Sequence, residues 1–336
     1  MTVIEAGISR RTMLAGLAAG CALAAFEGPL GAQAATVFPF KFTGHNGQLL
    51  RAPGFAVPSY QVTFFTAHQS TAQADIGVRS RLTATLTGIG DERMRALTDA
   101  AYADLRDQLT AAGIALMPAD QVRAAIVAGG SRLAPDNRDV KNIRGGISIG
   151  GSVRKAYLAF GAAEAPMIEG LHSATATGAG GILRRFGAQN QLNDATKALN
   201  AVLMMPSLVI DFADSDARSG RDFLGRKRAM TSTDLGFTVS STSRINLSTA
   251  MNNGRAVTPG AMYLTKDYRV DTPFAAVGSA DALSSVGQAD SSYLPEESER
   301  GTLIAVDVPA WEGLVREAYR AFNAVLVAEV VKAQRR

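Results

Sequence analysis

The sequence predicts an α/β domain in which helices cover a mixed sheet. Apolar residues recur with the period of an α-helix in three well-separated segments, 91–112, 190–204 and 309–333. Between them lie short apolar runs and alternating segments, which are typical of strands. The chain has 336 residues, of which 47% are hydrophobic and 19% charged, so it is long enough and apolar enough to bury a core.

The first half of the chain is predicted to run from strand to helix to strand. Residues 60–65 are rich in apolar and aromatic side chains, and residues 81–86 alternate between apolar and polar ones. Asp91 can cap the helix that follows, and Gly113 stands where a left-handed residue would end it. Residues 114–117 are predicted to form the next short strand.

The second half combines one buried strand with an antiparallel portion at 235–270. Pro206 is expected to end the helix at 190–204, and the apolar run at 207–212 predicts a buried strand. Residues 235–247 carry apolar side chains at odd positions and polar ones at even positions, which predicts a long strand with one apolar face. Residues 261–270 are expected to return beside it.

Two polar segments are predicted as loops. Residues 129–151 are rich in Gly, Asn, Asp and Arg, and they mark a possible subdivision within a single domain at 35–336. Residues 279–300 are rich in Ser, Asp and Glu, which favours an exposed loop. A last strand at 303–306 then leads into the final helix at 309–333.

Residues 1–34 are predicted to be a signal peptide. The stretch Ser9-Arg10-Arg11-Thr12-Met13-Leu14 resembles the twin-arginine signal, and the apolar run at 13–26 is too short to cross a bilayer. The resemblance implies a bacterial protein exported to the periplasm after folding. Cleavage after Ala34 would release a soluble protein, and the alternative is a lipoprotein anchored through Cys21.

The composition removes several classes of site. Cys21 is the only cysteine and lies in the predicted signal, so the processed chain would have no disulfide and no thiolate ligand or nucleophile. His45, His68 and His172 are the only imidazoles, and they are scattered along the sequence. We therefore expect no cofactor, apart from the Ca²⁺ considered below. The formal net charge of +4 is small for this length and does not indicate nucleic-acid binding.

Three aspartates, Asp211, Asp214 and Asp216, follow the predicted buried strand. Strand ends are where α/β sheets place ligands, and three carboxylates within six residues could hold a hard cation such as Ca²⁺. Arg218 stands where an acidic calcium loop would usually offer an oxygen. The alternative is an acidic turn whose charges pair with nearby arginines.

The densest basic cluster of the sequence comes next, in a segment interrupted by glycines. Such a segment could loop outward and bind anionic lipid headgroups or a polyanion, whereas the alternative is a solvated loop balanced by the preceding aspartates. Its members are Arg218, Arg221, Arg226, Lys227 and Arg228.

Catalytic motifs are weak. Ser152 and Lys155 match S-x-x-K, in which one helical turn places an amine beside a nucleophilic hydroxyl, but neither S-D-N nor K-T-G occurs. The motif H-E-x-x-H is absent as well. The sequence therefore assigns no catalytic residue.

The segment 81–122 resembles the envelope proteins related to the curli-secretion lipoprotein CsgG. Its strand, its helix at 95–112 and the continuation Ala112-Gly113-Ile114-Ala115-Leu116-Met117 carry the resemblance. The resemblance implies an α/β sandwich that later strands complete, and the alternating segment at 235–247 would suit the hairpins that such proteins extend. No functional residue is carried over from this family.

Three functional interpretations follow. The first is a non-catalytic periplasmic binding or envelope-assembly protein, whose partner is an envelope protein, a small-molecule ligand or an anionic membrane surface. The second is an exported hydrolase that uses carboxylates or a hard metal ion. The third is an oligomeric pore or secretion component. A groove or an exposed strand edge would favour binding, whereas His68 or His172 beside the three aspartates would count strongly for the hydrolase.

Overall fold

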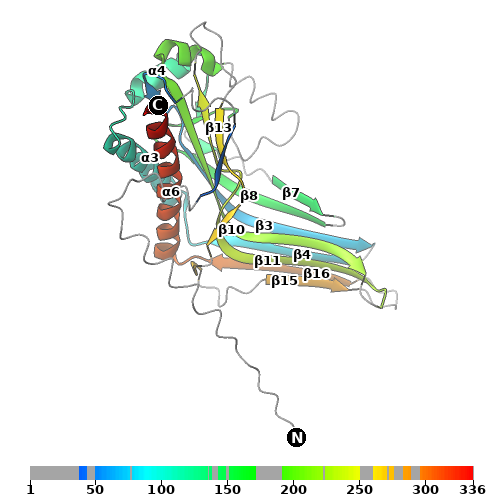
Figure 1. Ribbon diagram of the computed structural model, residues 1–336. Coiled ribbons are helices and arrows are strands. Elements are labelled where there is room, and N and C mark those ends of the chain that lie inside the picture. The colour runs from blue at the N-terminus through cyan, green and yellow to red at the C-terminus, as the bar shows by residue number, and fades with distance from the viewer. Residues whose placement is uncertain are drawn as a thin grey trace.

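In the computed structural model the protein consists of a head, made of helices and sheet, from which a long β arm projects (Figure 1). The predicted signal peptide lies outside the described residues. The structure describes residues 38–43, 50–75, 78–134, 136–137, 143–148, 151–171, 191–221, 224–249, 260–270, 272–275, 283–288 and 296–335. The helices are α3 (Asp91–Ala111), α4 (Ala119–Ala128) and α6 (Val308–Gln334), and residues 191–199 are also helical.

Parallel and antiparallel pairs occur together in one sheet of 14 described strands, and this confirms the predicted α/β class with a mixed sheet. Among the described strands, only β5 and β9 form a separate pair. The strands are β1 (Phe40–Thr43), β2 (Phe55–Ala56), β3 (Gln61–Asp75), β4 (Val78–Thr87), β5 (Leu133–Ala134), β6 (Asp136–Asn137), β7 (Ile143–Ser148), β8 (Gly151–Gly161), β9 (Met167–Ile168), β10 (Val202–Arg221), β11 (Lys227–Val239), β12 (Arg244–Ser248), β13 (Gly260–Leu264), β14 (Tyr268–Val270), β15 (Leu283–Gln288) and β16 (Glu296–Ala305).

The head has three layers around the first half of β10, where residues 202–213 are all buried. Val202 and Met204 belong to the core that includes α3 and α6. Leu203 and Met205 belong to a second core, with α4 and the helical residues 191–199. Because successive side chains of a strand point to opposite faces, this alternation shows that helices cover both faces of the sheet. A strand covered on both faces requires an unbroken apolar run.

Helices α3 and α6 meet around one buried amide. The Tyr60 hydroxyl donates a hydrogen bond to Asn323 Oδ1 at 2.8 Å, and Asn323 Nδ2 donates to the Ala101 carbonyl and to Asp104 Oδ2. The helical periodicity predicted for both segments is confirmed, since the members of each apolar face are buried. These members are Met94, Leu97, Ala101, Leu105 and Leu109 in α3, and Trp311, Leu314, Ala318, Phe322, Val325 and Leu326 in α6.

The ends of the helices agree in part with the predicted caps. Gly113 follows α3 with φ +77°, the left-handed conformation predicted there. Asp91 does not cap α3; it lies in the first turn after Gly90, where its charge still favours the helix dipole. The cap of α6 is Asp307, whose side chain accepts a hydrogen bond from the Ala310 N–H at 3.2 Å.

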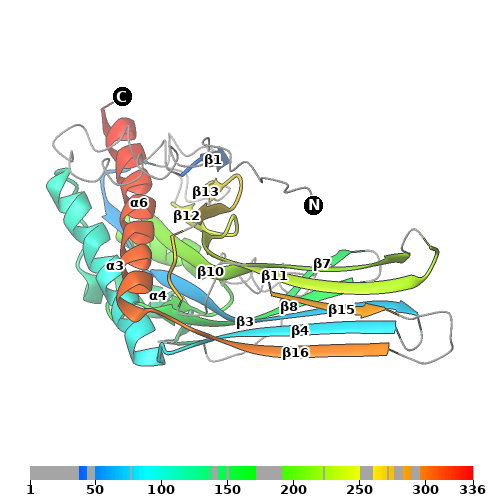
Figure 2. The ribbon, with the colours of Figure 1, turned by 90° about the horizontal axis from the view of Figure 1, so that it is seen from below.

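Three hairpins and two further strands run along the arm (Figure 2). The hairpins are β3–β4, β7–β8 and β10–β11, whereas β15 pairs with β11 and β16 pairs with β4. The registers place the far ends of these strands together: Asp75 pairs with Val78, Ser148 with Gly151, Arg221 with Lys227 and Glu296 with Val78. The arm is therefore built from segments that span more than half of the sequence.

The arm consists of two stacked layers. One contains β7, β8, β3, β4 and β16, and the other contains β10, β11 and β15. They join near the head, where residues 207–210 of β10 pair in parallel with residues 61–64 of β3. Beyond that point small and hydroxyl side chains fill the space between the layers, and Ser80 hydrogen-bonds Thr231 across it at 2.9 Å. The apolar cluster there consists of Ala72, Val78, Val153, Ala217 and Ala229.

Several predicted boundaries are wrong. The helix predicted at 190–204 ends at residue 199, and β10 begins at Val202 and continues through Pro206. Burial of residues 202–213 on both faces outweighs the single ladder hydrogen bond that a proline cannot donate. The strand predicted at 235–247 is divided by a turn at 240–243, where the Ser243 N–H donates to the Ser240 carbonyl at 2.9 Å. The predicted antiparallel return is present as β13 beside β12 and β14 beside β11.

Other segments differ as well. The strand predicted at 114–117 is reduced to one bridge between Leu116 and Phe55, and α4 follows without having been predicted. The loop predicted at 279–300 contains β15 and the start of β16, and the loop predicted at 129–151 contains β7. Among the described helices, none has an apolar stretch long enough to span a membrane.

Candidate functional site

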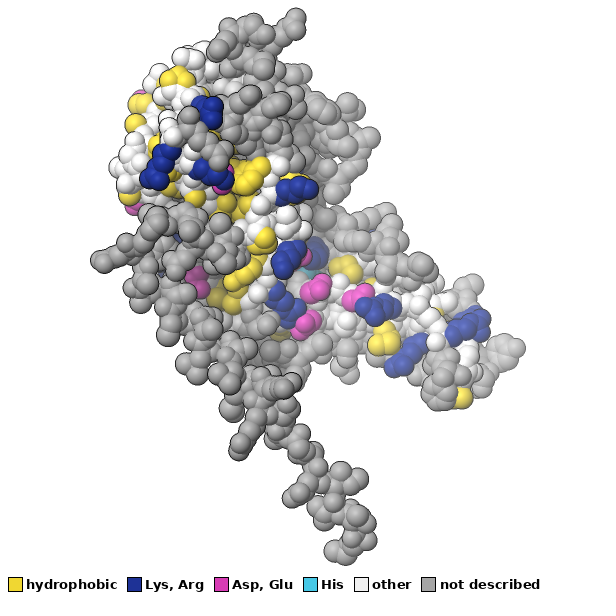
Figure 3. Space-filling view, in the orientation of Figure 1, with side chains coloured by type: hydrophobic (Ala, Val, Ile, Leu, Met, Phe, Trp, Pro, Cys, Tyr) yellow, Lys and Arg dark blue, Asp and Glu magenta, His cyan; other side chains and the backbone are white. Residues whose placement is uncertain are grey.

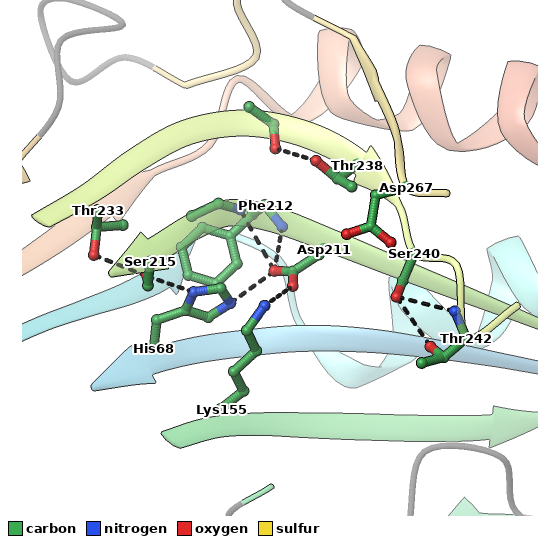
Figure 4. A network of polar contacts seen from close by, with 12 residues as sticks. His68, Lys155, Asp211, Phe212, Ser215, Thr233, Thr238, Ser240, Thr242 and Asp267 are labelled. Atoms are coloured by element: carbon green, nitrogen blue, oxygen red, sulfur yellow. Dashed lines mark hydrogen bonds and ion pairs between the residues drawn. The ribbon is translucent and has the colours of Figure 1, made fainter. Parts of the chain in front are cut away.

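A buried polar network joins the two layers of the arm close to the head (Figure 4). His68 comes from β3 and Lys155 from β8, both in one layer. Asp211 and Ser215 come from β10, and Thr233 comes from β11, in the other layer. The network therefore forms only when four separate strands are in register.

Asp211 is the centre of this network. Its Oδ1 atom lies 2.7 Å from His68 Nε2, and its Oδ2 atom accepts a hydrogen bond from Lys155 Nζ at 2.7 Å. The register between β10 and β11 shifts between Asp211 and Ala213, and the backbone N–H of Phe212 donates to Asp211 Oδ1 at 2.8 Å. A β-bulge of this kind redirects local backbone groups, here toward the buried carboxylate.

His68 extends the network toward the tip of the arm. Its Nδ1 atom lies 2.8 Å from Ser215 Oγ, which lies 2.9 Å from Thr233 Oγ1. An ionised carboxylate only accepts hydrogen bonds, so His68 Nε2 carries a proton. With a neutral imidazole, Nδ1 would accept a hydrogen bond from the Ser215 hydroxyl, whereas an imidazolium would donate one to Ser215 Oγ.

The charge of Asp211 is stabilised by its neighbours. Burial alone would raise the pKa of this carboxyl group, but His68 and Lys155 outweigh burial and leave the pKa below its usual range. Asp211 is therefore ionised at neutral pH. Lys155 supplies the compensating positive charge, so the buried pair is neutral overall.

Aromatic rings enclose the imidazole. The Phe212 ring centroid lies 4.8 Å from that of His68, and the Phe65 ring stands edge-on to it at 6.2 Å. Lys155 Nζ also lies 5.3 Å from the centroid of Phe65. The side chain of His68 is 0% exposed and that of Asp211 is 5% exposed. This packing strengthens the hydrogen bonds of the network by excluding water from them.

The contacts Ser215–His68–Asp211 follow the order of a Ser-His-Asp triad. Two features separate this network from a working triad. The carboxylate is neutralised by Lys155, which weakens its ability to stabilise an imidazolium. His68 is completely buried and Ser215 is also bonded to Thr233, so the base has no solvent-facing surface and the hydroxyl is held on two sides. The geometry as it stands suits a lock between the layers.

The three aspartates of the predicted calcium site do not come together. Asp211 points between the layers, whereas Asp214 and Asp216 lie on the outer face of β10, opposite Asp234 and Ser232 of β11. Asp216 forms an ion pair with Arg218, as the alternative interpretation predicts. In the part of the chain that the structure describes, no group of three His, Cys, Asp or Glu side chains is placed to hold a metal ion.

The predicted basic cluster lies at the far end of the β10–β11 hairpin. Arg218 and Arg221 belong to β10, and Lys227 and Arg228 to β11, directly across the turn. The structure therefore brings this cluster together, as members of one hairpin and not of a long loop. Ser152 and Lys155 of the S-x-x-K match lie on a strand, an odd number of residues apart, and so face opposite sides of β8.

Sequence reasoning missed His68, Lys155, Ser215 and Thr233 as partners of Asp211. One signal was present: His68, Ser70 and Ala72 alternate with Gln69, Thr71 and Gln73, so an ionisable residue stood in a row of small side chains. That pattern can indicate a buried polar row, but it does not identify which distant strand supplies the partner.

The comparisons with known proteins leave the fold and this network to carry the functional argument. No model of a known protein family, no curated protein and no solved structure matches the chain. The geometry itself defines a class: an α/β head that carries a two-layered β arm whose layers are joined by a buried ion pair and imidazole.

Proposed function

We propose that this chain is a non-catalytic binding or envelope-assembly protein, exported to the periplasm, whose arm carries the surface for its partner. The observation behind this proposal is the arm itself. Three hairpins and the strands β15 and β16 extend away from the head, and an internal network of charged and hydroxyl side chains holds their two layers together. Such an arm presents a large surface in a fixed shape.

The outer surface of the arm carries charges of both signs and two exposed apolar side chains, Met230 and Leu303. Acidic and basic side chains are interspersed along it (Figure 3). On β10 and β11 these include Asp214 and Arg218, with Met230 exposed between charged neighbours. β16 stands at the end of the strand order, beside β4, and such an end strand offers backbone groups to a partner.

The hydrolase interpretation is the second candidate, and one observation favours it. His68 contacts Asp211, which is the arrangement that we expected to count for catalysis. If the layers separated, Ser215 Oγ would be the nucleophile and His68 the base that removes its proton. The complete burial of His68 and the ion pair between Lys155 and Asp211 argue against this function in the closed arm.

Site-specific photo-crosslinking tests the binding function. A benzophenone amino acid would replace Met230 or Leu303 on the arm, and Val127 on α4 would be the control, because all three side chains are exposed. In cells that express the full chain, we expect adducts of defined mass from the arm positions only. Adducts from Val127 alone would contradict the proposal. An adduct of twice the chain mass would instead favour the oligomeric pore or secretion interpretation.

A serine-directed fluorophosphonate probe tests the hydrolase function. We expect no labelling of the folded protein, because Ser215 is engaged by His68 and Thr233. Labelling that disappears in Ser215→Ala but persists in Ser219→Ala, a serine of the same strand, would establish the hydrolase in place of the binding protein.

A further inference from the structure

The turn between β10 and β11 forms one end of the arm, far from the head (Figure 2). The two strands remain paired up to Arg221 and Lys227, so the backbone is in register as far as the turn. Leu224 follows within the turn, and its side chain is 62% exposed. Gly225 adopts φ +77°, which turns the chain back toward β11. The arm thus holds an exposed leucine at its tip.

Basic residues flank that leucine in the sequence. From residue 218 to residue 228 the sequence contains five basic residues and one acidic residue, so this segment has a formal charge of 5 − 1 = +4, equal to that of the whole chain. The side chain of Arg218 is 80% exposed, although it forms an ion pair with Asp216. Arg221 Nη1 donates to the Gly225 carbonyl at 3.2 Å, which places its guanidinium beside the turn.

We propose that this tip, formed by Arg218, Arg221, Leu224, Arg226, Lys227 and Arg228, docks on the surface of a membrane that contains anionic lipid. Clustered Lys and Arg side chains are attracted to anionic headgroups. An exposed leucine among them can enter the apolar boundary below the headgroups, which is how amphipathic surface segments bind. A polyanion would use the charges but would gain nothing from Leu224, so the combination favours lipid.

The location of the tip supports this partner. The turn lies at the far end of the arm, away from the head, so the head does not stand between it and a flat surface (Figure 1). This inference rests on the proposed function, in which the arm presents a binding surface, and it names the partner of the tip. The sides of the arm remain available to a protein partner.

Vesicle sedimentation tests the proposal. The purified protein would be mixed with vesicles of phosphatidylcholine alone, or of phosphatidylcholine with about one third phosphatidylglycerol, at low and high salt. We expect binding to the anionic vesicles only, weakened by salt because the attraction is electrostatic. Each basic residue near a membrane surface contributes about fivefold in partitioning, so Arg226→Glu/Lys227→Glu should lower binding by more than about 25-fold. Leu224→Ser should lower it by about tenfold.

Two matched variants control for charge and for apolar exposure elsewhere. Arg51→Glu reverses an exposed arginine of the head, and Leu303→Ser removes a leucine that is 70% exposed on the side of the arm. Both should bind anionic vesicles as the wild type does. Equal binding to neutral vesicles, or full binding by Arg226→Glu/Lys227→Glu, would overturn the proposal. An unchanged affinity of Leu224→Ser together with displacement by heparin would assign the tip to a polyanion instead.

These outcomes are separable from those of the crosslinking experiment. Loss of vesicle binding with retained adducts at Met230 or Leu303 would overturn the membrane partner and leave the binding function intact. Vesicle binding without any adduct from the arm would contradict the protein-binding function of its sides and leave the tip as a membrane contact.

Discussion

At the scale of single residues, Asp211 carries the greatest consequences for stability. A buried charge is tolerated only when its partners compensate for the water that it loses, and Asp211 has partners on both oxygens. Removing one member of such a pair leaves the other member buried and uncompensated. The network therefore makes closure of the arm depend on the identity of a few side chains.

Asp211→Asn should lower the free energy of unfolding by about 3 to 5 kcal/mol, because it leaves Lys155 without its counter-charge. Urea titration followed by circular dichroism would measure the change. Asp234→Asn is the matched control: Asp234 pairs with Arg269 at 2.8 Å, but its side chain is 50% exposed. Asp234→Asn should lower the free energy of unfolding by less than about 1 kcal/mol. Equal losses in the two variants would refute the assigned role of the network.

The difference in the free energy of unfolding between the wild type and Asp211→Asn should also depend on pH. The pKa of Asp211 is lowered in the folded state, so its contribution is fully present above the ordinary aspartate pKa and is lost as the pH falls through the lowered value. The two unfolding curves should therefore converge in strong acid. If the difference in the free energy of unfolding stays constant as the pH falls to the acid transition, the carboxylate charge does not stabilise the fold.

Asp104, between α3 and α6, should show the opposite dependence. Burial raises the pKa of Asp104, and the hydrogen bonds from Asn323 and Gln108 only partly offset that rise. A raised pKa means that the folded state binds the proton more tightly, so this contribution is present at low pH and is lost as the pH rises through the raised value. Relative to Asp104→Asn, the wild type should therefore be more stable at pH 4 than at pH 7. The urea midpoints of the two proteins at pH 4 and at pH 7 would measure this dependence. A wild type that is more stable relative to Asp104→Asn at pH 7 than at pH 4 would contradict it.

At the scale of elements, the layers of the arm approach one another closely at the start of β8. Gly151 pairs with Ala72 in its own layer and faces Ala217 of β10 across the gap. A methyl group at Gly151 would overlap the backbone carbonyl of Ala217, so a side chain there forces the layers apart. The close approach of the two layers therefore requires a residue without a side chain at position 151, and the conformational freedom of glycine plays no part in this requirement.

Gly151→Ala should destabilise the arm by about 1 to 3 kcal/mol, the usual cost of overpacking. Hydrogen exchange should increase in β8 and in the outer half of β10, while exchange in α3 and α6 stays unchanged. The control is Gly220→Ala, at a position in the same hairpin where an added methyl group meets no atom within 4 Å. Unchanged exchange in Gly151→Ala would show that the layers are not in close contact there.

The elements also show which parts of the fold can be predicted from the sequence. The apolar periodicity of α3 and α6 is visible in the sequence, because helical periodicity is a local property. For the outer half of β10 the sequence predicts an acidic turn and a basic loop, because its small and polar residues become a strand only by pairing with β11. His68 was not placed beside Asp211 for a related reason: that contact depends on strands of different hairpins being stacked.

At the scale of the whole molecule, the head and the arm are held together by different means. The head buries large apolar side chains from both faces of β10, and Trp311 and Phe322 of α6 lie among them. The outer arm buries mainly alanine, serine and threonine, which remove little apolar surface from water. Because β10 runs through both parts, one strand connects a strongly stabilised region with a weakly stabilised one.

This division predicts a gradient of hydrogen exchange along β10. Amides at 203–210 should be protected at least about tenfold more than amides at 214–221, although both parts are paired with neighbouring strands. The reason is that the outer amides can exchange when the two layers separate, whereas the inner amides require unfolding of the head. Exchange followed by mass spectrometry after proteolysis would measure both segments in one sample. Asp211→Asn should widen the difference, since it weakens the network nearest the head. Equal protection along β10 would mean that arm and head open as one unit, and in that case the network could not act as a separate lock on the arm.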